Sequence, residues 1–230
     1  LEGVVINEVS QPSYETKGIE SVVESTPLPE SLIVLAQWLT TYYRTPLATV
    51  LQTVLPRGLT KNRRTKKATE SQAPLRDRTQ IVLNDDQARA VETIMNTRAE
   101  TVLLQGVTGS GKTEVYKEVA RQTLAEGRST IVLVPEISLT SQIVDEFARE
   151  FPDVLITHSH MTEAERHHAW KKALASEAPL VAIGPRSALF MPVPRLGAIL
   201  VDEAHEPSYK QEQAPRYSAL RAASVVGKAA

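Results

Sequence analysis

After residue 100, the sequence alternates short apolar runs with longer stretches of helical periodicity. Five runs are rich in β-branched and aliphatic residues: 101–105, 130–134, 154–157, 180–184 and 198–202. Between them, apolar residues recur three or four positions apart, as in amphipathic helices. Runs that are apolar throughout are typical of strands buried on both faces, which crossover helices join in parallel. The sequence therefore predicts an α/β domain over residues 80–230, with helices on both faces of a mostly parallel sheet.

Residues 1–56 have a different pattern, which predicts part of a small α+β module. Two runs rich in valine and isoleucine lie on either side of a turn at Gln11-Pro12-Ser13 and predict short strands. Two amphipathic helices are predicted after them. The strands are expected at 3–9 and 18–24, and the helices begin after Pro29 and Pro46. Two strands cannot form a core alone, and the chain does not begin with methionine, so we expect the module to begin upstream of Leu1.

The stretch 57–79 between these two parts is strongly basic, with eight lysine or arginine residues against two acidic ones. It has almost no apolar residue, so it predicts a solvated linker whose charge also suits a phosphate backbone. The whole chain has 26 basic and 27 acidic residues and a net charge of −1. Binding of nucleic acid must therefore depend on local patches rather than on a uniformly basic surface.

Composition excludes several classes of site. The chain has no cysteine, which excludes disulfides, thiolate nucleophiles and cysteine-bound zinc and favours a reducing, intracellular compartment. No apolar run reaches the ~20 residues that span a bilayer, so we expect no membrane association. Four histidines lie close together in the sequence, at 158, 160, 167 and 168. They lack a carboxylate or cysteine at zinc-ligand spacing, so they predict exposed side chains and no zinc.

The motif G-x-x-x-x-G-K-[ST] lies between the predicted strand 101–105 and a predicted helix, and it predicts a phosphate-binding loop. Successive backbone N–H groups and the N-terminal end of the helix would surround phosphate oxygens. Lys112 is expected between the β- and γ-phosphates, and the Thr113 hydroxyl is expected to ligate Mg²⁺. The residues predicted to bind ATP in this loop are Gly106, Val107, Thr108, Gly109, Ser110, Gly111, Lys112 and Thr113.

A second motif, Asp202-Glu203-Ala204-His205, follows the apolar run 198–202. A carboxylate at the carboxyl end of a strand beside a phosphate loop can hold Mg²⁺, and the next carboxylate can polarise the attacking water. Asp202 and Glu203 have these roles in our prediction. A helix start is the alternative, because acidic residues are common in the first turn of a helix. The phosphate loop in the same predicted sheet favours the catalytic interpretation.

These two motifs resemble the ATP-binding and Mg²⁺-binding motifs of superfamily 2 helicases of the DEAH type. Three further segments, 133–140, 184–190 and 208–217, are similar to signatures of the bacterial replication-restart helicases of the primosomal N′ (PriA) family. The resemblance extends from Asn84 to Tyr217. It implies a RecA-like P-loop NTPase domain that forms the first half of the motor of an ATP-dependent DNA helicase. Such a helicase acts in primosome assembly and replication restart.

The resemblance also implies roles for individual residues. Gln87 would read the adenine edge, with a surface position near a helix start as the alternative. Lys112, Asp202, Glu203 and His205 would be the catalytic residues, and His205 would serve as a relay between the two carboxylates and the aromatic-rich loop at 208–217. The residues expected to contact single-stranded DNA are Pro135, Glu136, Arg186, Ser187, Tyr209, Lys210, Arg216 and Tyr217. Ordinary turns at strand ends, with the two tyrosines packed at the rim of the sheet, are the alternative.

Residues 1–56 are similar to the end of the family's 3′-DNA-end-binding domain, which implies forked DNA as a partner. Primosome proteins, single-strand DNA-binding protein and a cytoplasmic place at the nucleoid are implied in the same way. The stretch before Asn84 is too short for the family's winged-helix domain, and 218–221 replaces its Arg-Asp pair. The chain ends before the second motor domain, so we expect nucleotide binding with weak hydrolysis. Two alternatives stay open: a nucleotide-gated fork-binding module without motor activity, and a DEAH-type RNA helicase.

Overall fold

A parallel sheet of four strands, in the order β2-β3-β1-β4, forms the centre of the molecule. The computed structural model describes residues 4–6, 15, 19–56, 82–107, 109–135 and 142–230. The strands of the sheet are β1 (Ser129–Leu133), β2 (Val154–Ile156), β3 (Val181–Gly184) and β4 (Leu196–Val201). Each lies within one residue or two of a predicted apolar run. The predicted α/β class with a parallel sheet is confirmed.

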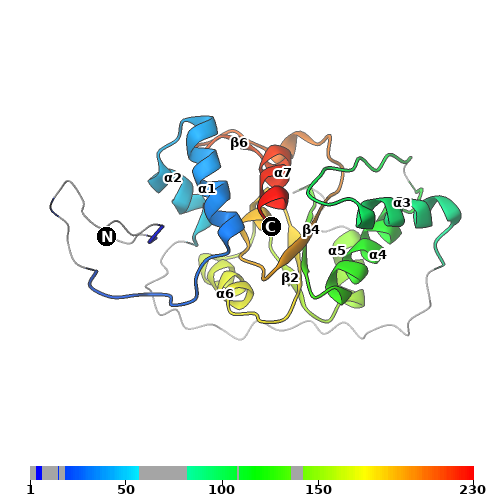
Figure 1. Cartoon of the computed structure of the whole chain (residues 1–230), viewed down its shortest axis with the longest axis horizontal. Helices are drawn as coiled ribbons and strands as arrows, with labels where there is room; N and C mark the ends of the chain where they lie inside the picture. Colours follow the sequence, from blue (N-terminus) through cyan, green and yellow to red (C-terminus); the bar gives the residue numbers. More distant parts are fainter. Residues whose placement is uncertain (1–3, 7–14, 16–18, 57–81, 108, 136–141) are drawn as a thin grey trace.

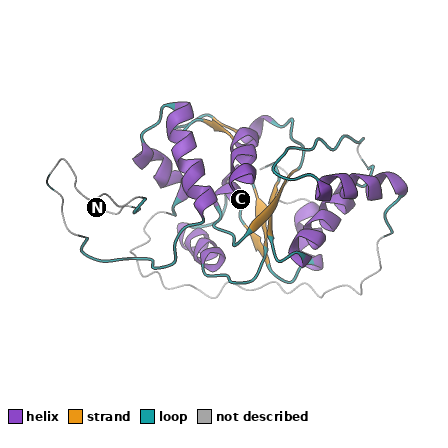
Figure 2. Cartoon of the chain, viewed as in Figure 1, coloured by secondary structure: helices purple, strands orange, loops and turns teal. Residues whose placement is uncertain are grey.

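Helices cover both faces of this sheet (Figure 1). One face packs against α3 (Asp85–Asn96), α4 (Lys112–Ala125) and α5 (Gln142–Glu150). The other packs against α6 (Glu163–Leu174), α7 (Ala219–Ala229), α1 (Glu30–Tyr43) and α2 (Leu47–Val54). Figure 2 shows the strands between these two groups of helices.

Alternate residues of each strand supply the two cores. Val132 lies between Ile183 of β3 and Leu200 of β4, and all three side chains pack in the core under α4 and α5. Its neighbour Ile131 packs in the opposite core, with α6 and α7. Because successive side chains of a strand point to opposite faces, a strand covered on both faces is apolar at nearly every position, and in β1 only Ser129 and Thr130 are polar. This requirement explains the continuous apolar runs in the sequence.

The N-terminal helices share the core of the sheet domain. Four apolar residues of α1 recur at helical spacing and are all buried: Leu32, Leu35, Ala36 and Leu39. They pack in the same cluster as Ala222 and Val226 of α7. The backbone N–H of Ser218 also donates to the Tyr43 hydroxyl at 3.0 Å. The two helices predicted as the tail of a separate module are therefore packed on the sheet domain.

Two predicted strands differ from the structure. Residues 101–105 form no strand, because no neighbouring backbone among the described residues pairs with them, and Leu103 is 82% exposed. Residues 19–24 form no strand either, and Ile19 and Val22 are exposed. An apolar run becomes a strand only where a partner edge is within reach. The predicted strand at 3–9 lies mostly outside the described residues, and the basic stretch 57–79 lies wholly outside them.

Short elements follow β3 and β4 at their carboxyl ends. A 3₁₀ helix, η2 (Arg186–Phe190), follows β3, and η3 (Pro207–Tyr209) follows β4. The loop after η3 contains a small antiparallel pair, β5 (Lys210–Gln211) with β6 (Tyr217–Ser218). Neither this pair nor α7 was predicted from the sequence. In the part of the chain that is described, no helix has the length and apolar character needed to cross a membrane.

Candidate nucleotide-binding site

The predicted site residues that the structure describes gather at one edge of the sheet, where the parallel strands have their carboxyl ends. Asp202 follows β4 directly, Pro135 follows the end of β1, and Arg186 follows β3. The phosphate loop joins them, since α4 begins at Lys112 and packs against both β1 and β4. Ligands of open α/β sheets bind outside the carboxyl ends of the strands. The fold therefore brings the two sequence motifs to the edge where such a site is expected.

The phosphate loop has the backbone that its glycines permit. Gly109 and Gly111 both have a φ of +79°, a region that residues with a side chain rarely adopt. A Cβ on Gly111 would lie 2.3 Å from Nε2 of Gln87. The loop is exposed at its tip, where Val107 is 79% exposed, and Thr108 lies outside the described residues. Its backbone is thus accessible to a ligand at the N-terminal end of α4.

Lys112 lies along this loop. Its Nζ donates hydrogen bonds to the carbonyl of Gly106 at 3.0 Å and to that of Val107 at 3.3 Å. These carbonyls hold the ammonium group beside the loop, where an incoming phosphate would exchange with them as a stronger, charged acceptor. The position fits the predicted contact of Lys112 with the β- and γ-phosphates.

Gln87 lies against the phosphate loop rather than free in solvent. It is the third residue of α3 and completes a capping box with Asn84: the Asn84 backbone N–H donates to Oε1 of Gln87 at 2.9 Å. Its Nε2 donates to the carbonyl of Ser110 at 3.1 Å. Both polar ends of the amide therefore have partners, so reading of an adenine edge would require one of them to exchange. Adenine recognition by Gln87 stays a prediction.

Asp202, Glu203 and His205 form a tight turn after β4. The backbone N–H of Asp202 donates to the Leu133 carbonyl at 2.9 Å and so extends the sheet by one residue. Glu203 has a φ of +45°, in the left-handed region, and its carbonyl accepts the N–H of Glu206 at 2.9 Å. Nδ1 of His205 lies 3.6 Å from Oε2 of Glu203, and both side chains are exposed. His205 is thus next to Glu203, where the predicted relay would need it.

Charge links the two motifs across the edge of the sheet. Burial raises the pKa of Asp202 above its ordinary value, and the nearby Glu203 carboxylate raises it further. The Glu203 backbone N–H, the Lys112 ammonium and the Tyr116 hydroxyl oppose this rise. Lys112 of the phosphate loop therefore lies close enough to Asp202 to act on its charge. A cation at this place would further stabilise the ionised carboxylate.

The residues of this edge fit a Mg²⁺ ion shared with phosphate oxygens. Mg²⁺ in nucleotide sites is held by one or two protein oxygens, and phosphates and water supply its other ligands. Thr113, in the first turn of α4, and Asp202, at the end of β4, supply a hydroxyl and a carboxylate. Among the described residues, no group of three His, Asp or Glu side chains is placed to hold a metal. The donor set thus suits an ion that arrives with a nucleotide.

Tyr116 was not predicted as a site residue. It lies three residues after Thr113 on α4, so both side chains project from neighbouring turns of the same helix face. It is 7% exposed, and burial followed by the charges of Asp202 and Glu203 raises the pKa of its hydroxyl. The helical spacing from Thr113 is the sequence signal that could have identified it. Its neighbours on α4, Val115 and Val119, are apolar and buried, so in the sequence Tyr116 has the pattern of an ordinary core residue.

Apart from Arg186, which is half-buried, the predicted DNA contacts divide into three groups. The exposed group is Ser187, Lys210 and Arg216, whose side chains are accessible to a DNA strand. Glu136 lies outside the described residues. The buried group is Pro135, Tyr209 and Tyr217. A buried ring has no free face for a nucleobase, so the structure corrects the predicted stacking by the two tyrosines. The alternative that the sequence left open, packing at the rim of the sheet, describes them.

Arg186 is engaged within the protein. Its Nη1 donates to the Ser208 carbonyl at 2.6 Å, and its Nε donates to Oε1 of Gln211 at 2.8 Å. The guanidinium group therefore joins η2 to the loop at 208–217. Its direct contact with DNA stays a prediction, and its remaining N–H groups are the donors that could make one.

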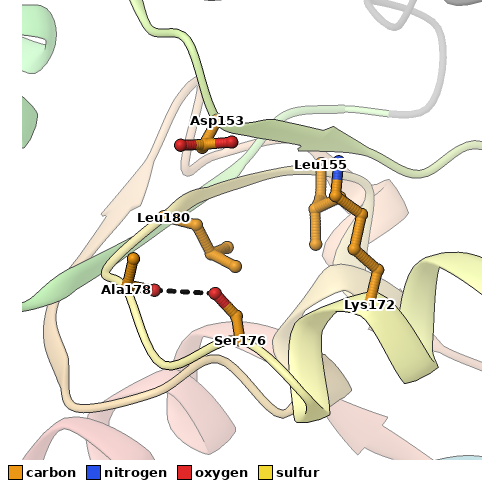
Figure 3. A pocket seen from close by; sticks show the side chains of 6 residues that line it. All are labelled: Asp153, Leu155, Lys172, Ser176, Ala178 and Leu180. Atoms are coloured by element: carbon orange, nitrogen blue, oxygen red, sulfur yellow. Dashed lines mark hydrogen bonds between the residues drawn. The ribbon is translucent and has the colours of Figure 1, made fainter.

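A cavity of about 110 Å³ lies at the opposite edge of the sheet, beside the amino ends of β2 and β3 (Figure 3). Its lining residues are Asp153, Leu155, Lys172, Ser176, Ala178 and Leu180. The Ser176 hydroxyl donates to the Ala178 carbonyl at 2.8 Å. None of the predicted site residues lines this cavity, so it is separate from the nucleotide site.

Comparisons with known proteins agree with this geometry. A family model described as DEAD/DEAH box helicase matches residues 84–226, and a model of a 3′ DNA-binding domain matches residues 1–56. The chain is 46% identical over 148 residues to the replication restart protein PriA of Bacillus subtilis (strain 168), a match covering 62% of the chain and 18% of that protein.

Two further relatives with the same name match more of the chain. The protein of Rickettsia conorii is 33% identical over an alignment of 240 residues. This alignment covers 99% of the chain and 35% of the relative. The protein of Treponema pallidum is 37% identical over 190 residues, which cover 82% of the chain and 28% of the relative. The chain spans about a third or less of the length of these relatives. The resemblance to the PriA family is confirmed, and the chain belongs to the DEAD/DEAH box helicases.

Proposed function

We propose that this chain binds ATP with Mg²⁺ and hydrolyses it as part of a DNA helicase that acts in replication restart. The observation that carries the proposal is that α4, which begins at Lys112, packs against β4, and that Asp202 follows β4 at the carboxyl edge of the sheet. A phosphate-binding lysine and a metal-binding carboxylate on the same edge are the two halves of a P-loop NTPase site. The match to replication restart proteins supports DNA as the substrate and restart as the process.

Each residue of the site has a defined task in this reaction. The backbone N–H groups of the phosphate loop surround the phosphates, and Lys112 neutralises negative charge on the β- and γ-phosphate oxygens. Thr113 and Asp202 would hold Mg²⁺, which supplies positive charge to the γ-phosphate in the transition state. Glu203 orients the attacking water and accepts its proton. His205, 3.6 Å from Glu203, would connect this carboxylate to the loop that begins at Pro207.

The DNA side of the proposal rests on exposed groups at the same edge. Ser187 follows Arg186 in η2, and Lys210 and Arg216 lie on the loop after η3. Hydroxyl and cationic side chains are the groups that contact a phosphate backbone. The 3′ DNA-binding match at residues 1–56 supports recognition of a forked DNA end. Primosome proteins, single-strand DNA-binding protein and a cytoplasmic location at the nucleoid are further parts of this proposal.

Steady-state ATP hydrolysis tests the proposal. The protein as the cell makes it should hydrolyse ATP faster when single-stranded or forked DNA is added. Glu203→Gln should bind ATP with unchanged affinity and lose at least about a hundredfold in turnover, because the amide cannot accept a proton from water. Wild-type turnover in the Glu203→Gln variant would contradict the assigned mechanism.

Two other functions are distinguished by the choice of nucleic acid. A nucleotide-gated fork-binding module would bind forked DNA in an ATP-dependent way without strand separation. An RNA helicase would hydrolyse ATP faster with RNA than with DNA. We expect stimulation by DNA to exceed stimulation by RNA, together with strand separation. The reverse order would replace the proposed substrate.

A further inference from the structure

Tyr209 connects the loop after β4 to the backbone of the acidic motif. Its side chain is 3% exposed, and its hydroxyl lies 2.6 Å from the carbonyl oxygen of Asp202 and 3.0 Å from that of Leu133. A hydroxyl has one proton to donate, and the Leu133 carbonyl already accepts the N–H of Asp202. The shorter contact therefore identifies the Asp202 carbonyl as the main acceptor of the Tyr209 proton.

This carbonyl belongs to the peptide that joins Asp202 to Glu203. The orientation of that peptide sets the φ of Glu203, which is +45°. A residue with a side chain keeps a left-handed backbone only where surrounding contacts hold it. Tyr209 therefore holds the carbonyl side of this peptide.

Tyr209 is itself fixed in position by its neighbours. Arg186 donates to the carbonyl of Ser208, the residue before Tyr209, and to the side chain of Gln211 two residues after it. The ring packs in the core that also contains Phe190 and Tyr217. The hydroxyl is therefore held at a defined point, and it can impose an orientation on the peptide.

We propose that Tyr209 is a positioning residue, which directs the Glu203 carboxylate by holding the Asp202–Glu203 peptide. The inference rests on the proposed ATPase function of Asp202 and Glu203. The left-handed turn at Glu203 then has a cause outside the acidic motif: without the Tyr209 hydroxyl, the peptide can rotate and Glu203 can leave its left-handed conformation. Such a rotation moves the carboxylate that orients the attacking water.

The test compares Tyr209→Phe with Tyr217→Phe in the protein as the cell makes it. Both variants remove one buried hydroxyl from the same loop and keep the ring, but only Tyr209 donates to the Asp202 carbonyl. Three quantities are measured: kcat for ATP, the Kd of a non-hydrolysable ATP analogue, and hydrogen exchange in the segment 201–206. Glu203→Gln is the reference for loss of hydrolysis.

Tyr209→Phe should lower kcat about ten- to hundredfold, because small misplacement of a catalytic group has effects of this size. It should leave the Kd of the analogue within about twofold, and hydrogen exchange at 201–206 should become faster. Tyr217→Phe should change none of the three. Equal values of kcat and exchange in the two tyrosine variants, with Glu203→Gln inactive, would overturn the inference and leave the proposed function intact. Full activity of Glu203→Gln would instead remove the proposed function on which the inference rests.

Discussion

Gly111 is the residue of the phosphate loop whose structural requirement is most specific. Its φ is +79°, and a Cβ would come within 2.3 Å of Nε2 of Gln87. Gly109 has the same φ, but nothing lies within 4 Å of a Cβ built there. A side chain added at Gly109 would therefore cause backbone strain alone, whereas one added at Gly111 would cause the same strain and a collision with Gln87. Gly111 permits both the turn of the loop and the close approach of α3.

Alanine at these two glycines gives a matched prediction. Gly109→Ala should cost about 1–2 kcal/mol of stability from the left-handed backbone alone. Gly111→Ala should cost more and should also weaken ATP binding, because it displaces Gln87 from the Ser110 carbonyl. Denaturant unfolding and nucleotide titration of both variants measure this. Equal losses of stability and affinity would show that the contact with Gln87 is unimportant.

The Lys117 side chain joins helices α4 and α5 through ion pairs. Its side chain is 6% exposed, and Nζ lies 2.7 Å from Glu114, 3.3 Å from Glu146 and 3.6 Å from Glu150. Burial alone lowers the pKa of Lys117, but the hydrogen bond to Glu114 and the charges of the three carboxylates together raise it above its usual value. The Lys117 amino group therefore holds its proton more firmly in the folded protein than in the unfolded chain.

Lys117→Met should destabilise the protein by about 3 kcal/mol near pH 7, because three carboxylates would lose their shared cation. A raised pKa contributes stability that is fully present below about pH 10.5 and is lost as the pH rises through the folded value. The difference between wild type and variant should therefore shrink above that pH. Denaturant unfolding from pH 7 to 11 measures it. A constant difference across this range would contradict the ion-pair account.

Helix starts were more predictable from the sequence than strands or loop contacts. Local sequence signals indicate such starts: the Thr162-x-x-Glu165 spacing is typical of a capping box, and Asn84 or Asp85 can cap the helix that follows. The structure has capping boxes at Thr162 and at Asn84. The strand expected at 101–105 failed, because strand formation depends on a distant partner that periodicity does not reveal. The base stacking predicted for Tyr209 failed for the same reason: its hydroxyl contacts the carbonyls of Leu133 in β1 and of Asp202 just after β4, and only the fold brings these two positions together. Sequence motifs identified the phosphate loop and the acidic residues of the candidate site. The contacts that hold these residues in place, such as the Tyr209 hydrogen bond to Asp202, could be found only in the structure.

At the scale of the whole molecule, the N-terminal helices and the sheet domain form one packed unit. Leu35 and Leu39 of α1 are fully buried, and they share a core with α6, α7 and the strands. A core that extends across both segments links their stability, because loss of one exposes the apolar face of the other. The unit that carries the candidate nucleotide site is thus held together with helices that match a DNA-binding domain.

Leu39→Ala should lower the stability of the whole unit by about 3–4 kcal/mol, since it leaves a cavity at a site with no exposure. Thr41→Ala, at an exposed position of the same helix, is the control and should change stability by less than about 0.5 kcal/mol. Calorimetry should show one transition that moves to lower temperature. A separate early transition of the N-terminal helices, with the sheet domain unchanged, would contradict the shared core.

Nucleotide titration tests the central claim most directly. The wild-type protein should bind a fluorescent ATP analogue more tightly with Mg²⁺ than without it, because Asp202 and Thr113 are placed to share the ion with the phosphates. Lys112→Ala should bind the same analogue at least about tenfold more weakly, the cost of one charge-assisted contact to phosphate. If Lys112→Ala binds the Mg²⁺ complex as tightly as wild type, the loop at 106–113 is not the phosphate site.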